Sequence, residues 1–237
     1  MHYKAIIFDM DGTILDTVDD LTASVNYAMG QCGHRTGFTR EDGCRMFGSG
    51  AHTALQRALA MEAGMTDPAF LRRIGTPAMM TVPGISEEEV SRIEAVFRPW
   101  YLVHSMDRTG PYEGIPELLR TLKDRGFLTA VVSNKPDPAV ARLAADCFEN
   151  LFASAAGERP GIRRKPAPDM VEAVLDSFGL APDQALYIGD SEVDVETAAN
   201  CGMDCVCVSW GFRPADYLRS LGPLAVIDRP EDLLALV

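Results

Sequence analysis

The fold of this chain is decided at Phe8-Asp9-Met10-Asp11-Gly12-Thr13. The stretch closes the apolar run Ala5-Ile6-Ile7-Phe8, which is typical of a short buried strand that ends at a turn. Residues two apart on a strand point the same way, so we expect Asp9 and Asp11 to lie side by side where the strand ends. Two carboxylates that close repel each other unless a cation or a shared proton compensates. An isolated Asp-x-Asp is often only an acidic turn, but this pair also fits a nucleophile, a neighbouring acid/base and a seat for Mg²⁺.

The composition is that of an ordinary folded protein. Of the 237 residues, 47% are hydrophobic and 24% are charged, which argues against disorder and allows one large domain or a core with a smaller domain. The formal net charge of −12 argues against a nucleic-acid partner. An acidic protein that handles an anionic substrate must therefore gather its positive charge locally.

The cysteines and the hydropathy pattern indicate a cytoplasmic protein. None of the six cysteines forms a Cys-x-x-Cys pair, so we expect buried reduced thiols rather than disulfides or a metal site. The first strand begins within a few residues of Met1, which predicts no signal peptide. No apolar run approaches the roughly 18 residues of a membrane span, so no membrane partner is expected.

Between about Asp16 and Tyr112 the sequence is helical in character. Capping residues at 16–20 precede a helix that extends to about Gln31, and residues 51–63 carry apolar side chains at helical spacing. Ser86-Glu87-Glu88-Glu89 has the Ser-x-x-Glu form of a capping box at the start of a further helix.

From Gly114 onward, predicted helices and strands alternate. The strands are expected at 128–132, 152–154, 185–188, 205–208 and 224–227, with helices between them. Near-continuous apolar strands separated by helices predict a Rossmann-like parallel sheet with helices on both faces. The first strand belongs with this half. We therefore expect an α/β core domain over 1–15 and 113–237 and an inserted all-helical domain over 16–112, with ligands at the carboxyl ends of the strands.

Two loops that follow predicted strands carry residues suited to binding a phosphoryl group. Ser133-Asn134-Lys135-Pro136 offers a hydroxyl, an amide and backbone N–H groups, although Ser-Asn is also a common turn pair. In Arg163-Arg164-Lys165-Pro166-Ala167-Pro168, proline restricts the preceding residue, so the Lys165 ammonium is expected to be held in place. The alternative for this loop is a solvated basic surface. Nothing in the sequence assigns Arg163 or Arg164 to substrate or to solvent.

A third segment, Gly189-Asp190-Ser191-Glu192-Val193-Asp194, places one carboxylate at a strand tip and another four residues later. Mg²⁺ prefers octahedral oxygen ligands and usually takes one or two carboxylates plus water and substrate phosphate. Asp9, Asp190 and the backbone carbonyl of Asp11 would supply a fitting set. Asp194 would orient a metal-bound water or cap the following helix.

In the order Asp-x-Asp-Gly-Thr, Ser-Asn-Lys, Lys-Pro-x-Pro and Gly-Asp-Ser-x-x-Asp, these segments resemble motifs I to IV of the haloacid dehalogenase-like (HAD) hydrolases. The resemblance covers essentially the whole chain and implies a Mg²⁺-dependent phosphatase of a small phosphorylated metabolite. Its implied catalytic residues are Asp9, the nucleophile that forms an aspartyl-phosphate, Asp11, the acid/base, and Lys165. Its implied phosphate-binding residues are Gly12, Ser133, Asn134 and Lys165. Its implied metal ligands are Asp9, Asp11 and Asp190, with Asp194 and Ser191 behind them.

The helical insertion lies where this superfamily places a type C1 cap, a mobile lid that selects the leaving group. Arg45-Met46-Phe47-Gly48-Ser49-Gly50-Ala51-His52 resembles the specificity loop of the phosphoglycolate phosphatase-like branch, and Trp210-Gly211-Phe212 resembles the same branch. The backbone N–H groups of Gly48, Ser49, Gly50 and Ala51, at a helix start, would bind a small carboxylate, with Arg45 or His52 assisting. The alternative is that the glycines only make a tight turn. 2-Phosphoglycolate is accordingly the expected substrate.

Features of other branches are missing. No lysine lies between Lys4 and Lys123 to form the Schiff base of the phosphonatases, and Asp16 to Leu21 lacks the cap histidine of the β-phosphoglucomutases. Dehalogenases do not keep an aspartate at the position of Asp11. An inorganic pyrophosphatase, a broad sugar- or nucleotide-phosphate phosphatase, and a catalytically silent binding protein on this fold stay as alternatives. The sequence leaves the choice between monomer and homodimer open.

Overall fold

The computed structural model describes residues 3–237, and they divide into two compact units. The core unit runs up to Asp16 and resumes over Gly110–Val237, and the helical unit is Thr17–Thr109. Two short strands of the core unit, β2 (Leu15–Asp16) and β3 (Gly110–Pro111), pair antiparallel where the chain leaves and re-enters it. The domain boundaries predicted from the sequence, after residues 15 and 112, differ from these borders by one and three residues.

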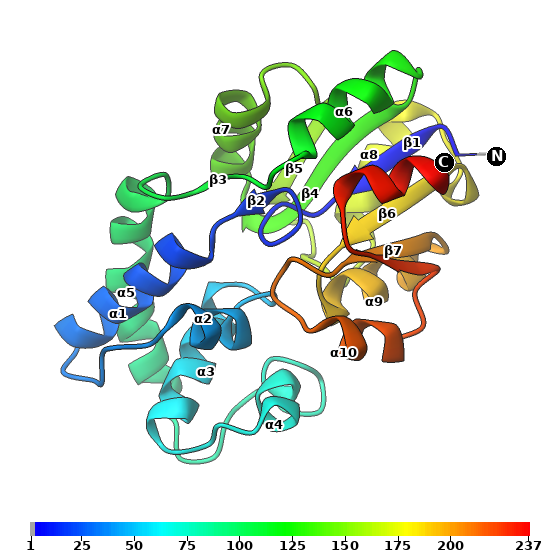
Figure 1. Cartoon of the computed structure of the whole chain (residues 1–237). Coiled ribbons are helices and arrows are strands. Elements are labelled where there is room, and N and C mark those ends of the chain that lie inside the picture. Colours follow the sequence, from blue (N-terminus) through cyan, green and yellow to red (C-terminus); the bar gives the residue numbers. More distant parts are fainter. Residues whose placement is uncertain (1–2) are drawn as a thin grey trace. The chain divides into compact units, whose positions relative to one another are not determined.

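The core unit is built on one six-stranded sheet in which all neighbouring strands are parallel (Figure 1). The strand order is β5-β4-β1-β6-β7-β8. The bounds are Ala5–Phe8 (β1), Leu128–Pro136 (β4), Ser154–Glu158 (β5), Ala185–Gly189 (β6), Asp204–Val208 (β7) and Ala225–Ile227 (β8). β1 is central, and its last residue, Phe8, pairs with Val131 of β4 and Ile188 of β6.

Helices cover both faces of this sheet, as the sequence predicts. On one face, α8 (Asp169–Phe178) and α9 (Glu192–Cys201) share a buried cluster with strand residues such as Ile7 and Val132. On the other face, α6 (Ile115–Asp124) brings Leu118 beside Phe8 and Ile188. The remaining helices of the unit are α7 (Asp137–Phe148), α10 (Ala215–Ser220) and two short 3₁₀ turns, η1 (Pro182–Gln184) and η2 (Pro230–Ala235). The predicted Rossmann-like α/β fold is confirmed.

The element boundaries differ from the sequence prediction at three places. β4 continues to Pro136, because its pairing with β5 resumes there after a register shift. β5 begins at Ser154 rather than two residues earlier, since Phe152 packs its ring edge-on against Phe8 before the strand starts. α10 was not predicted, because its six residues bury only one side chain, Leu218.

The helical unit consists of five helices joined by loops and turns. They are α1 (Val18–Gln31), α2 (Arg40–Met46), α3 (Ala51–Glu62), α4 (Pro68–Arg73) and α5 (Glu87–His104). α1 packs along α5, where the Tyr27 ring stacks on Trp100 with 3.5 Å between centroids. Within residues 3–237, no helix is both long enough and apolar enough to span a bilayer.

The predicted capping box at the start of α5 is wrong. Ser86 is the N-cap residue, but its side chain makes no capping hydrogen bond. Glu89, which was expected to reach back to it, contacts His34 and accepts hydrogen bonds from Arg92. A charged donor forms a stronger hydrogen bond than a neutral backbone N–H, so Glu89 turns away from the cap.

Candidate active site

Charged side chains from five segments meet at the carboxyl ends of β4, β1 and β6. Asp9 follows β1 directly, Asp190 follows β6, and Lys135 lies near the end of β4. Lys165 comes from the loop before α8, and Asp194 comes from the first turn of α9. Parallel strands end at the same edge of a sheet, which is why residues so far apart in the sequence come together here.

The Lys165 ammonium makes the central contacts of the site. Its Nζ lies 2.8 Å from Asp9 Oδ1, 2.8 Å from Asp194 Oδ1 and 3.1 Å from Tyr187 Oη. An ammonium has three N–H donors, so these three oxygens occupy all of them. The backbone of the lysine is held as well, because its N–H donates to Asn134 Oδ1 at 2.8 Å and its carbonyl accepts from Asn134 Nδ2 at 3.0 Å.

Burial and charge act in opposite directions on these groups. Burial raises the pKa of Asp9 to about 7, although the Lys165 ammonium lowers it. Burial alone would lower the pKa of Lys165, but attraction by Asp194 and Asp9 outweighs burial and raises it well above its usual value. Burial also raises the pKa of Asp190, and repulsion from Asp194 and Asp9 adds to the effect. The site therefore concentrates more negative charge than Lys165 compensates.

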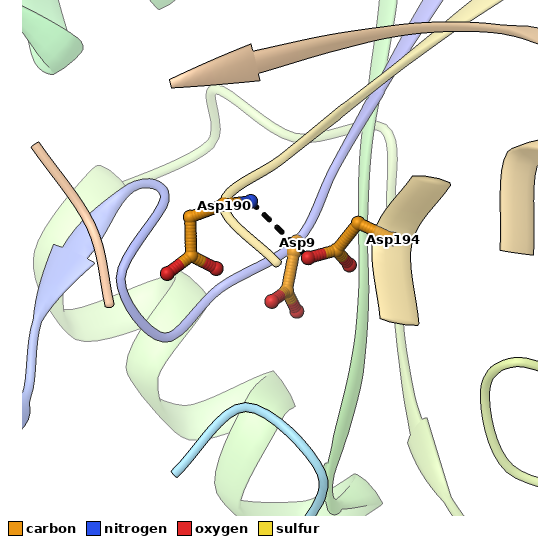
Figure 2. A group of neighbouring side chains, drawn as sticks. All are labelled: Asp9, Asp190 and Asp194. Atoms are coloured by element: carbon orange, nitrogen blue, oxygen red, sulfur yellow. Dashed lines mark hydrogen bonds between the residues drawn. The ribbon is translucent and has the colours of Figure 1, made fainter. Parts of the chain in front are cut away.

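Asp9, Asp190 and Asp194 form an acidic group in which one carboxylate oxygen of each lies within 4.8 Å of the others (Figure 2). Asp194 is completely buried. Its Oδ2 accepts hydrogen bonds from the N–H groups of Asp190 and Ser191 at 3.1 Å and from the Ser191 hydroxyl at 2.7 Å. Asp194 therefore caps α9 and holds the turn that carries Asp190, while its other oxygen contacts Lys165.

The charge balance fits a divalent cation. The residues are four carboxylates (Asp9, Asp11, Asp190 and Asp194) and two ammonium groups (Lys135 and Lys165). If all six are ionised, two formal negative charges are left over, and one divalent cation would balance them. Carboxylate oxygens are the ligands that Mg²⁺ prefers, and they are close enough together here to share an ion.

Asp11 lies beside this acidic group but contacts a different lysine. Lys135 Nζ is 3.1 Å from Asp11 Oδ1. The following residue, Gly12, has φ +82°, and a Cβ there would lie 2.3 Å from Asp190 Oδ2. The backbone after Asp11 therefore passes directly against Asp190, and only glycine leaves room for that approach.

Two residues predicted to hold the phosphoryl group are used differently from each other. Both polar atoms of the Asn134 side chain bind the backbone of Lys165, so this side chain positions the lysine. Ser133 Oγ accepts a hydrogen bond from the Lys135 N–H at 3.2 Å. Its hydroxyl proton has no acceptor in the described part of the chain.

Arg163 lies exposed and pairs with Asp169 through Nη2 and Oδ2 at 2.9 Å.

The residues predicted to contact the substrate from the insertion lie in the helical unit, around the loop between α2 and α3. Gly48 and Gly50 both have positive φ, +106° and +87°. Arg45 pairs with Glu41 on its own helix. The ring nitrogens of His52 each face a carboxylate of α5, at 2.8 Å from Glu94 Oε2 and 3.1 Å from Glu87 Oε2. Both polar atoms of the imidazole are thus engaged within the helical unit.

The remaining residue of this loop, Ser49, is held by an arginine that sequence reasoning missed. Arg57 of α3 is completely buried, and its Nη2 donates to Ser49 Oγ at 3.1 Å. The same guanidinium also donates to backbone carbonyls at the ends of α2 and α4, those of Met46, Phe47, Leu71 and Ile74. Arg57 therefore fixes the loop from its inner side.

Three core residues were also absent from the predicted site. Lys135 had a visible signal, since it is one of only four lysines in the chain and stands in the Ser-Asn-Lys segment. Tyr187 is a polar side chain in an otherwise apolar strand, which is a weak signal for its hydrogen bond to Lys165. Arg213, which is buried and forms an ion pair with Glu192, directly follows the Trp210-Gly211-Phe212 segment, whose resemblance gave no signal for this pair.

The transfer of an anionic phosphoryl group requires a nucleophile with positive charge beside it. This site offers the buried Asp9 carboxylate, the Lys165 ammonium and a group of carboxylates that could hold a cation. Without that positive charge, a carboxylate would repel the group it attacks. The fold and the site together are those of a phosphoryl-transfer hydrolase with a parallel-sheet core.

Comparison with known proteins narrows this class. The sequence pattern of the haloacid dehalogenase-like hydrolases matches residues 6–208. The chain is 31% identical over 232 residues to phosphoglycolate phosphatase 1 of Pseudomonas aeruginosa, covering 98% of this chain and 78% of that relative. It is 29% identical to the N-acetylmuramic acid 6-phosphate phosphatase of the same organism, covering 99% and 94%. A crystal structure from Lactobacillus delbrueckii subsp. bulgaricus, provisionally named a phosphoglycolate phosphatase, is 47% identical with a TM-score of 0.95, covering 98% and 97%.

The chain therefore belongs to the haloacid dehalogenase-like hydrolase family, in its phosphoglycolate phosphatase-like branch. It is a phosphoric monoester hydrolase, as the sequence predicts.

Proposed function

We propose that this phosphatase hydrolyses a small phosphate monoester through an aspartyl-phosphate on Asp9, with Mg²⁺ as cofactor and 2-phosphoglycolate as the preferred substrate. The observation that carries the proposal is the position of Asp9. Its carboxylate is 2.8 Å from a buried ammonium and within the acidic group that would hold the cation, at the end of the central strand. A nucleophile at that point can meet a phosphoryl group whose charge is already compensated.

In the first step, a carboxylate oxygen of Asp9 attacks phosphorus, and the bond between phosphorus and the ester oxygen breaks. Asp11, two residues further along the chain, donates a proton to the departing oxygen, so the product leaves as an alcohol. Lys135, 3.1 Å from Asp11 Oδ1, orients this carboxyl group.

In the second step, Asp11 accepts a proton from water, and the resulting hydroxide attacks the phosphorus of the aspartyl-phosphate. The phosphorus–oxygen bond to Asp9 breaks, which releases inorganic phosphate and restores both carboxyl groups to their starting forms. The same residue therefore acts as acid and then as base, because both proton transfers take place on the side where the alcohol leaves.

Lys165 would bind a phosphoryl oxygen with the N–H that it donates to Asp9 in the resting protein. Its contacts to Asp194 and Tyr187 would persist and keep the ammonium in place. The Ser133 hydroxyl is buried, and its proton has no acceptor among residues 3–237. It would donate a further hydrogen bond to the phosphoryl group.

Asp9, Asp190 and the Asp11 backbone carbonyl would hold Mg²⁺, with Asp194 and Ser191 supporting the turn that carries Asp190. When bound, the ion supplies positive charge that offsets the phosphoryl oxygens and the nucleophile.

The choice of 2-phosphoglycolate rests on the phosphoglycolate phosphatase relatives and on the Gly48–Gly50 loop, whose backbone N–H groups suit a small carboxylate. Because His52 is engaged by two glutamates and Arg45 pairs with Glu41, we assign the recognition to the loop backbone. A sugar phosphate is the second candidate, because an N-acetylmuramic acid 6-phosphate phosphatase matches 99% of the chain.

Substitution of Asp9 tests the mechanism. Asp9→Asn keeps the shape but removes the nucleophilic charge, and we expect the rate of phosphate release to fall by about 10⁴-fold or more, as for other nucleophile deletions. Asp19→Asn, at a surface ion pair with Arg40, is the matched control and should retain full activity. Activity of the Asp9 variant near that of the control would contradict the aspartyl-phosphate route.

A substrate panel tests the specificity. Phosphate release would be measured with Mg²⁺ or with EDTA from 2-phosphoglycolate, sugar phosphates, nucleoside monophosphates and pyrophosphate. We expect the highest kcat/KM for 2-phosphoglycolate, and a rise in its KM in the Gly48→Ala variant. Equal turnover of many esters would leave the chemistry intact but contradict the substrate assignment.

A further inference from the structure

Four consecutive residues after β7, Trp210 to Arg213, surround Asp190 and the turn that follows Asp11. The Trp210 indole N–H donates to the Thr13 carbonyl at 3.0 Å. The Phe212 backbone N–H donates to Asp190 Oδ2 at 2.6 Å. We call these four residues the clamp segment. These two hydrogen bonds lie within the core unit.

Gly211 shows how closely the clamp segment approaches. A Cβ at this position would lie 2.4 Å from Asp190 Oδ2 and 2.4 Å from the Gly12 carbonyl oxygen. Real side chains do not come so close, so the backbone of the clamp segment lies directly on the carboxylate. Only glycine allows this contact.

Arg213 anchors the far end of the clamp segment. Its side chain is 3% exposed and donates two hydrogen bonds to the Glu192 carboxylate. Nε donates to Oε2 at 2.7 Å, and Nη2 donates to Oε1 at 2.8 Å. Glu192 begins α9, two residues after Asp190. Removing charged groups from water costs free energy. A bidentate contact between a guanidinium and a carboxylate is the geometry that best offsets that cost.

We propose that the clamp segment sets the orientation of the Asp190 carboxylate for the metal ion, and that Arg213 is the positioning residue that holds the segment in place. The inference rests on the proposed metal site. Arg213 is outside the set of residues proposed to hold the ion and the substrate. It acts by tying the segment that carries the Phe212 N–H to the helix that begins beside Asp190.

The geometry leaves Asp190 little freedom. Its Oδ2 is held by the Phe212 N–H, its Oδ1 lies 3.5 Å from the Thr13 hydroxyl, and its backbone N–H is bound to Asp194. If Arg213 no longer holds the segment, the carboxylate can rotate, and the ion must then restore its orientation on binding. Loss of such outer contacts typically weakens metal affinity by about 10- to 100-fold.

The test is to measure Mg²⁺ binding to metal-stripped protein, without substrate, by isothermal titration calorimetry. For Arg213→Met, we expect the dissociation constant to rise by about 10- to 100-fold. In phosphate-release assays, the Mg²⁺ concentration for half-maximal rate should rise by the same factor, while kcat at saturating Mg²⁺ should change little. A defect confined to folding would not produce that separation.

Arg219→Met is the matched control, because Arg219 forms an exposed ion pair with Asp216 on the neighbouring α10. It should bind Mg²⁺ like the unsubstituted protein. If Arg213→Met does not fold in EDTA, Arg213→Lys keeps the charge but loses the two-bond fork, and it should show a smaller loss of affinity. Unchanged affinity in the folded variant would overturn the role of the clamp segment. Absence of Mg²⁺ binding in the unsubstituted protein would overturn the metal site itself.

Discussion

Lys165 in the core unit and Arg57 in the helical unit are both buried cations, but their surroundings differ. Lys165 contacts two carboxylates and a phenol, in a site that contains more negative than positive charge. Arg57 donates to backbone carbonyls at the ends of two helices and to one serine hydroxyl. A cation among ionisable groups can change partners when charge moves, whereas one that satisfies backbone carbonyls stabilises a fixed structure. The first arrangement suits catalysis and the second suits scaffolding.

Removal of the Lys165 charge should have the largest effect on activity. In Lys165→Met, the phosphoryl oxygens lose a preorganised donor, and Asp9 and Asp194 lose their shared counter-ion. We expect kcat to fall by about 10²- to 10³-fold or more, the range for loss of one such donor. Steady-state phosphate release at saturating Mg²⁺ would measure it. Lys123→Met, at an exposed lysine bound to the Asn150 carbonyl, is the control.

A kcat for Lys165→Met within a few-fold of the unsubstituted enzyme would break the comparison, because the buried lysine would then be structural like Arg57.

Removal of Arg57 should affect stability before chemistry. Arg57→Met leaves several buried carbonyls without their donor, and each unsatisfied group costs about 1–3 kcal/mol, so the helical unit should lose at least that much stability. Hydrogen exchange followed by mass spectrometry should show faster exchange in α2 to α4, with the core strands unchanged. Arg92→Met, at an exposed arginine of α5, is the control.

If Arg57→Met instead lowered kcat as strongly as the lysine variant while exchange stayed slow, the scaffolding role would be contradicted.

The smallest predicted effect is a pH dependence of the helical unit. The His34 ring nitrogens face Glu62 Oε2 at 2.8 Å and Glu89 Oε1 at 2.6 Å. Partial burial lowers the pKa of His34, but the bonds to Glu89 and Glu62 outweigh burial and raise it above 6.5. A pKa that is raised in the folded state means that protonated His34 contributes its full stability below the unfolded value of 6.5. The contribution is lost as pH rises through the folded value.

We therefore expect the unfolding free energy of the unsubstituted protein, minus that of His34→Gln, to decrease between pH 5.5 and 8.5. The difference at the acidic end should be about 0.5 kcal/mol, since the groups are partly exposed. Denaturant titrations at several pH values would measure it, with His104→Gln as the control for a half-buried histidine that faces a single carboxylate. A difference that grows with pH would contradict the assignment.

The sequence was sufficient for the parts of the site that lie next to one another in the chain. The position of Asp9 at the tip of a buried strand follows from the apolar run before it, and the Asp190 turn follows from a strand that ends before a helix. The parallel sheet follows from apolar segments alternating with helical ones. These inferences need only local periodicity and the rule that parallel strands share one carboxyl edge.

The sequence could not predict the contacts between segments that lie far apart in the chain. No local pattern indicates that Asn134 holds the Lys165 backbone, that Tyr187 completes its three hydrogen bonds, or that Glu89 leaves its cap for His34. Which of several partners a polar atom binds depends on their charge and their distance. The distances are fixed only when the segments pack together.

By itself, then, the sequence determined the family, the parallel sheet and the positions of Asp9 and Asp190 at the ends of its strands. The tertiary structure alone decided which oxygen each ammonium contacts, and that the buried Arg213 pairs with Glu192 beside Asp190. The physical reason is range. Backbone periodicity acts over a few residues, whereas hydrogen bonds and ion pairs act over a few ångströms between residues that only folding brings together.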